Sequence, residues 1–170
     1  MASTIQIHEL TALDTGIDRT IATIRFKAAD DQNVDGNAPL VIPASGQVYS
    51  YTKQIRAYMS VAPNTNVQNI RYYTNGSNGF GTGVDVQGKN IGQAYSGQII
   101  TKMTGSGQKS IFSWVSATPC NANTNDLGPW TPTSLNHHIG DTIQLQMVAD
   151  SSASGGQLSA QSLICAYDEI

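Results

Sequence analysis

The stretch of sequence that decides the fold class is QVYSYTKQIRAYMSV, residues 47–61. Its side chains fall into two alternating sets: Tyr49, Tyr51, Ile55, Ala57, Met59 and Val61 on one side, and Ser50, Thr52, Gln54, Arg56, Tyr58 and Ser60 on the other. A period of two residues is typical of a β-strand with one buried and one solvated face. Lys53 is the only residue that departs from the pattern. A strand of this length usually bends or bulges, so we expect it to contribute to two sheets.

The same alternation recurs outward from this run, and the three-to-four-residue period of an amphipathic helix is absent. Further strands are predicted at residues 4–10, 20–26, 67–74, 82–87, 98–104, 110–116, 142–149 and 158–167. Clusters of Gly and Asn separate them, as the turns of a sandwich or barrel require. We therefore predict an all-β fold, an antiparallel two-sheet β-sandwich of jelly-roll type with about eight to ten strands.

The 170 residues are enough for one domain, which we expect to span residues 1–170. Residues 1–10 form either an N-terminal arm or a strand of that domain. Residues 118–138 are rich in Asn, Pro and Thr and are predicted to be a long loop. A connection of this length without its own secondary structure is usually functional.

The composition is poor in charge. Only 12% of the residues are charged and the net charge is −3, whereas the 16 Ser, 16 Thr, 13 Gln and 12 Asn make up about a third of the chain. The nine basic residues are scattered, which argues against nucleic acid as a partner. The longest apolar run, residues 163–167, is far shorter than a membrane helix requires, so no membrane partner is expected. Interface cores are depleted in charge, so this composition favours protein assembly.

Two motifs contain residue types that bind metals. The run DQNVDG places Asp31, Asn33 and Asp35 as in the first half of an EF-hand loop, but the twelfth position is Ile42 instead of a chelating Glu. These three residues are weak metal candidates, and an acidic turn is the preferred interpretation. Extended side chains at His137 and His138 would point to opposite faces, so the pair cannot hold one ion. We expect no metal and no cofactor.

No residues are arranged as a catalytic centre would require. The nucleophile motif G-x-S-x-G does not occur, and no pair of carboxylates stands out among the twelve acidic residues. The protein is therefore predicted not to be an enzyme. Cys120 and Cys165 do not form a disulfide framework, and we expect two free thiols in a reducing compartment.

Eight short segments resemble, in order, a family of small structural proteins of tailed bacteriophages. They are RFKAADD (25–31), PLVIP (39–43), YSYTK (49–53), APNT (62–65), NIRYY (69–73), NG (75–76), GTGV (81–84) and CAYDE (165–169). The resemblance implies a virion protein made in the bacterial host cytoplasm and located on the capsid surface. Its implied role is that of a decoration, or cement, protein that binds the major capsid protein as a homotrimer and stabilises the phage head.

Two alternative functions stay open: a tail, adaptor or fibre-associated virion protein, and a carbohydrate-binding module that uses loop aromatics. The residues themselves indicate where a partner would bind. Ile5 and Ile7 lie on a strand close to the terminus that could extend a neighbour's sheet. Phe80, Leu127 and Trp130 are large apolar residues in predicted loops. We take these five as candidate partner contacts.

Overall fold

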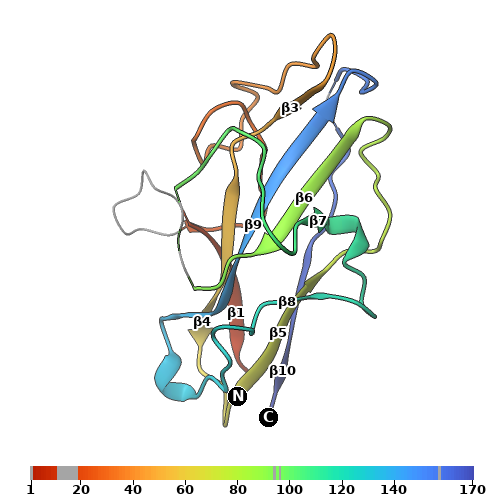
Figure 1. Cartoon of the computed structure of the whole chain (residues 1–170). Helices are drawn as coiled ribbons and strands as arrows, with labels where there is room; N and C mark the ends of the chain where they lie inside the picture. The colour runs from red at the N-terminus through yellow and green to blue at the C-terminus, as the bar shows by residue number, and fades with distance from the viewer. Residues whose placement is uncertain (1, 11–18, 94, 96, 157) are drawn as a thin grey trace.

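The computed structural model describes residues 2–10, 19–93, 95, 97–156 and 158–170 and contains two antiparallel sheets (Figure 1). The larger sheet has the order β2-β1-β4-β9-β6-β7, and β3 also pairs with β9. Its strands are β1 (Thr4–Leu10), β2 (Arg19–Thr20), β3 (Gln47–Tyr49), β4 (Lys53–Val61), β6 (Val84–Asn90), β7 (Lys109–Ser110) and β9 (His138–Asp150). The smaller sheet has the order β10-β5-β8, formed by β10 (Ile164–Glu169), β5 (Val67–Tyr73) and β8 (Cys120–Asn121).

The core lies between the two sheets. The alternating residues Ile55, Ala57 and Met59 of β4 are at most 2% exposed, and they share one apolar cluster with Ile70 and Tyr72 of β5. Burial of the inward face of each strand is what the period-two pattern predicts. The prediction of an all-β chain with two antiparallel sheets is confirmed, and the arrangement is consistent with a β-sandwich.

The run at residues 47–61 forms two strands instead of one. Both β3 and β4 pair with β9, so the run stays in a single sheet and the expected contribution to two sheets is wrong. The interruption lies at residues 50–52. There the Ser50 hydroxyl accepts a hydrogen bond from the Met147 amide at 3.1 Å, while the Thr52 amide donates to the Ile99 carbonyl at 2.8 Å.

Two other predicted strands do not form over their predicted lengths, each for its own reason. Within residues 98–104, Gln146 bonds the Met103 amide and the Thr101 carbonyl through its side chain, so a buried amide replaces the strand ladder. Within residues 110–116 the chain forms the 3-10 helix η1 (Ile111–Ser113). This turn places Trp114 in the core against Gly88, where a side chain on residue 88 would overlap the indole ring.

The ends of the chain are joined within the fold. Of the predicted strand at 20–26, only β2 and one further hydrogen bond from Ile21 to Ile7 pair with β1. β1 itself lies between β2 and β4, so it is an internal strand of the larger sheet. The Ser3 amide donates to both carboxylate oxygens of Glu169, at 2.9 and 3.0 Å, which brings the two termini side by side (Figure 1).

The predicted loop at 118–138 contains short elements of its own. β8 lies near its start, and the 3-10 helix η2 (Pro132–Ser134) lies near its end. Between them Trp130 forms an isolated bridge with Val67. In the described part of the chain, η1 and η2 are the helices, and no helix there has the length and apolar character to cross a membrane.

Candidate functional site

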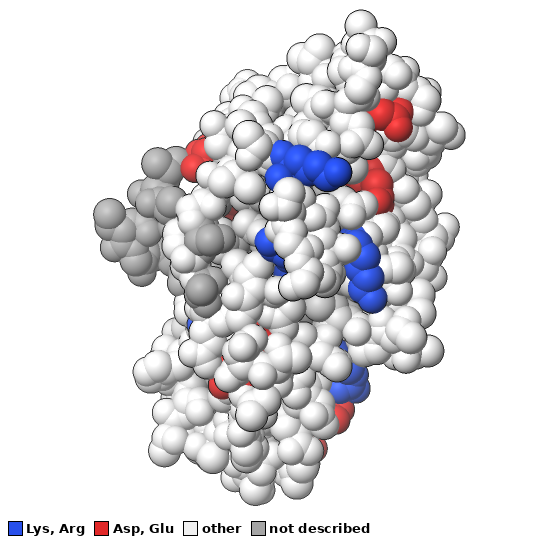
Figure 2. All heavy atoms as spheres, in the orientation of Figure 1, with Lys and Arg blue, Asp and Glu red and all other residues white. Residues whose placement is uncertain are grey.

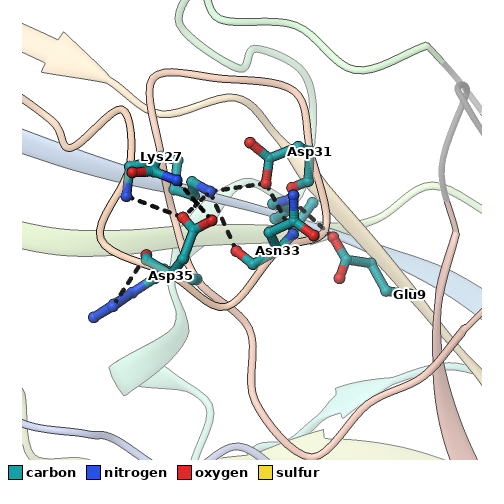
Figure 3. A network of polar contacts seen from close by, with 8 residues as sticks. Glu9, Lys27, Asp31, Asn33 and Asp35 are labelled. Atoms are coloured by element: carbon teal, nitrogen blue, oxygen red, sulfur yellow. Dashed lines mark hydrogen bonds and ion pairs between the residues drawn. The ribbon is translucent and has the colours of Figure 1, made fainter.

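The acidic loop that resembles half an EF-hand closes around a lysine ammonium (Figure 3). Lys27 Nζ lies 2.8 Å from Asp31 Oδ1, 2.7 Å from Asp35 Oδ1 and 3.3 Å from the Asn33 carbonyl oxygen. Three acceptors match the three donors of an ammonium group. One carboxylate oxygen of Asp31 and one of Asp35, both weak metal candidates, therefore bind a cation of the chain itself.

The electrostatics of this loop follow from those contacts. Hydrogen bonds from Lys27 are the main cause that lowers the pKa of Asp31 and of Asp35. Reciprocally, the bonds to Asp31 and then to Asp35 raise the pKa of Lys27. Each partner thus stabilises the charged form of the other, so the loop carries its own counterion.

A second buried lysine explains the one misfit in the strand pattern. Lys53 and Glu9 face the core side of β4 and β1 with side chains 1% and 2% exposed, and Lys53 Nζ lies 2.9 Å from Glu9 Oε1. Lys53 also donates to the Asp31 carbonyl, which ties this ion pair to the acidic loop. The alternating pattern identifies Lys53 as a misfit, but it does not identify Glu9. Alternation within one strand does not show which acidic residue of a neighbouring strand lies beside the lysine.

Asp141 of β9 organises the beginning of the 118–138 segment. Its fully buried carboxylate accepts hydrogen bonds from the Thr124 hydroxyl, the Asn90 amide group and the backbone amides of residues 124–126. Burial by itself would raise the pKa of Asp141, but these bonds outweigh it and lower the pKa to about 2. These contacts are structural, since they tie residues 124–126 to β9 and to Asn90 of β6.

The same segment bounds a shallow pocket of about 240 Å³. Asp126 on its wall accepts from Trp130 Nε1 at 2.9 Å and from the Arg56 guanidinium at 3.2 Å. The complete lining is Asp126, Trp130, Thr133, Ser134, His137, His138 and Ile139. Two donors already hydrogen-bond to the Asp126 carboxylate. The polar groups that the pocket wall presents to a ligand are therefore mainly the hydroxyl and imidazole groups of the other lining residues.

The structure distributes the five predicted contact residues unevenly. Ile5, Ile7 and Phe80 pack against the apolar core, Phe80 with its ring edge-on to Phe112, and Trp130 is only 6% exposed. Only Leu127, which is 68% exposed, presents its side chain to the surroundings. The alternation that singled out Ile5 and Ile7 marks the inward face of β1, and Phe80 and Trp130 form no shared aromatic platform for a sugar.

The two cysteines are free, as expected. Tyr72 of β5 pairs with Cys165 on one side and with Cys120 on the other, so a complete strand separates them. Two strand spacings amount to about 9.5 Å, beyond the limit of about 7 Å for a disulfide. Burial is the main cause that raises the pKa of each thiol to about 11.

The exterior is poor in charge. On the face drawn in Figure 2, the Lys, Arg, Asp and Glu side chains form only small scattered patches. Part of the reason is that Lys27, Lys53, Glu9 and Asp141, with at most 2% exposure each, lie inside the fold. The charge available to the surface is therefore lower than the composition alone implies.

Comparisons with known proteins yield no match to a protein-family model, to a curated protein or to a solved structure.

Proposed function

We propose that this protein is a non-enzymatic structural component of a tailed-bacteriophage virion. Its role is that of a capsid decoration protein that binds the outer surface of the major capsid protein lattice and stabilises the head as a homotrimer. The proposal rests on the eight segments that resemble phage structural proteins and on the nature of the surface.

The observation that carries the proposal is the uncharged exterior. Four ionisable side chains are held inside the fold, and the surface visible in Figure 2 is dominated by uncharged residues. Docking such a surface on another protein strands few ions at the contact, and the cores of interfaces are depleted in charge for that reason. Val41, at 76% exposed, and Leu127, at 68% exposed, add apolar side chains on loops.

We further propose that the sandwich is a jelly roll. After β4 the chain passes repeatedly between the sheets: β5 lies in the smaller sheet, β6 and β7 in the larger, β8 in the smaller, β9 in the larger and β10 in the smaller. Alternation between two packed sheets is typical of the jelly-roll architecture of capsid proteins.

The physical advantage of such a protein comes from mass action. A ligand that binds the assembled shell and not its free subunits stabilises the shell by RT ln(1 + [L]/Kd). When three linked chains engage three neighbouring subunits, each weak contact is reinforced by the effective concentration of the others. A small sandwich with few charged residues is suited to this task.

The test has two parts. Light scattering on the purified protein should give three times the 18.1 kDa mass of one chain. The protein should then co-sediment with capsids of its own phage at a fixed ratio to the major capsid protein. A monomer that leaves capsids unbound contradicts the proposal, and a few copies per particle that follow the tail fraction support the tail or adaptor alternative.

A further inference from the structure

Three aromatic rings from three adjacent strands meet on the outer face of the larger sheet. Tyr58 of β4 and His138 of β9 are direct cross-strand partners, and their neighbours Ala57 and Ile139 point into the core. His8 of β1 reaches over β4 to join them. Its ring stacks on Tyr58 with centroids 4.1 Å apart and meets His138 edge-on at 5.1 Å.

The two imidazoles approach each other through their nitrogens. His8 Nδ1 and His138 Nε2 are 3.2 Å apart, and His8 Nε2 lies 3.0 Å from Thr20 Oγ1. Thr20 Oγ1 in turn donates to Gln6 Oε1 at 3.2 Å. Since an amide oxygen can only accept, the threonine proton is committed to Gln6, and the threonine oxygen must accept from His8. This assigns the proton of neutral His8 to Nε2 and leaves a lone pair on Nδ1, directed at His138.

The spacing of the two nitrogens matches a pair of metal ligands. Zinc–imidazole bonds are about 2.0–2.1 Å long, so two ligands at a tetrahedral angle stand about 3.3 Å apart. A histidine ligand also needs a hydrogen-bond acceptor on its other nitrogen, which fixes the tautomer and the ring orientation. Thr20 and Gln6 provide that support for His8. Stacking on Tyr58 further restricts the His8 ring.

We propose that His8 Nδ1 and His138 Nε2 form a two-histidine binding site for a divalent transition-metal ion, with Zn²⁺ as the ion whose geometry fits best. The metal replaces the hydrogen bond between the rings, and the His138 proton moves from Nε2 to Nδ1, so both imidazoles stay neutral. Imidazole nitrogen is a preferred ligand of Zn²⁺, Cu²⁺ and Ni²⁺.

The two imidazole nitrogens are the protein ligands that the described residues supply. Among those residues, no group of three or more His, Cys, Asp or Glu side chains is placed to hold a metal ion. His138 also lies in the wall of the shallow pocket beside Asp126. With two protein ligands the site binds less tightly than a four-ligand structural zinc site. It would connect β1 to β9 across β4, and so stabilise the larger sheet in proportion to metal concentration.

The experiment uses untagged, chelator-treated protein titrated with ZnCl₂ near neutral pH, followed by calorimetry and thermal unfolding. One zinc per chain and a rise in Tm are expected. His8→Phe and His138→Phe, which keep a flat ring of similar size, should each lose both signals. His137→Ala is the matched control, because His137 is sequence-adjacent but bonds the Leu135 carbonyl instead, and it should bind as the native protein does.

Two further measurements protect the test against a misfolded variant. Thr20→Val leaves both imidazoles in place and should weaken zinc binding about tenfold, the lower range for loss of a supporting contact. Cu²⁺ bound to the native protein should show hyperfine coupling to two imidazole nitrogens in electron paramagnetic resonance. Absence of binding at millimolar zinc, unchanged affinity in both phenylalanine variants, or loss of binding in His137→Ala overturns the proposal.

Discussion

Lys53→Met tests whether the buried ion pair on β1 and β4 stabilises the fold. The side chains of Lys53 and Glu9 are 1% and 2% exposed, with Nζ and Oε1 2.9 Å apart. At an effective dielectric constant of about 20, unit charges at that distance attract by about 6 kcal/mol. Desolvation offsets much of this in the intact pair, but removing one partner leaves the other charge buried and uncompensated, which costs about 3–5 kcal/mol.

Urea unfolding followed by fluorescence gives the free energy of unfolding, and the predicted loss for Lys53→Met is about 3–5 kcal/mol. For a chain of this size, that corresponds to a fall in Tm of roughly 6–20 °C. Adding Glu9→Gln to Lys53→Met should recover part of the loss, because the stranded carboxylate is gone. Lys102→Met, at an exposed position, is the control and should change stability by less than about 0.5 kcal/mol. A loss below about 1 kcal/mol for Lys53→Met, or additivity of the two changes, would refute the reasoning.

Three further predictions concern single elements of the fold. The pKa of Asp141 is lowered to about 2 in the folded chain, so its contribution of about 2 kcal/mol to the free energy of unfolding is present above pH 4 and is lost as the pH falls toward 2. Asp141→Asn should be less stable at neutral pH, and its free energy of unfolding should fall less steeply in acid. Equal pH profiles for the variant and the native protein would count against this role. Gly88→Ala should destabilise by about 1–3 kcal/mol, measured by thermal unfolding, because its methyl group would overlap Trp114; an unchanged Tm would show that the indole moves freely. Cys120 and Cys165, with pKa values raised to about 11, should react slowly with a thiol reagent at neutral pH and stay unbridged in air, whereas a disulfide in the mass spectrum would contradict the strand order.

The period-two pattern predicted the strands well where one face is buried and the other is wet. β1 has the predicted bounds, and β5 ends one residue before the predicted end. The same pattern failed at residues 98–104, because the hydrogen-bond partner of that segment is the side chain of Gln146 and not another strand. Local sequence carries no sign of such a long-range side-chain contact.

The candidate sites show the same division between local and long-range information. The convergence of Asp31 and Asp35 could be anticipated from their spacing, but Lys27 at the centre could not be, since any nearby cation satisfies two carboxylates. His8 and His138 are separated by 130 positions, and only the order β1-β4-β9 brings their rings together. The sequence predicts no metal at His138, because the adjacent His137 points to the opposite face and no spacing links His8 to a set of ligands.

A cryo-electron microscopy map of the native phage particle tests most directly whether this chain is a capsid decoration protein. We predict three-fold clusters of two-layered β density on the outside of the head, each spanning neighbouring major capsid subunits and fitted by the two sheets described here. A head lattice with a bare outer surface, or density for this chain confined to the tail or missing from the particle, would contradict the account.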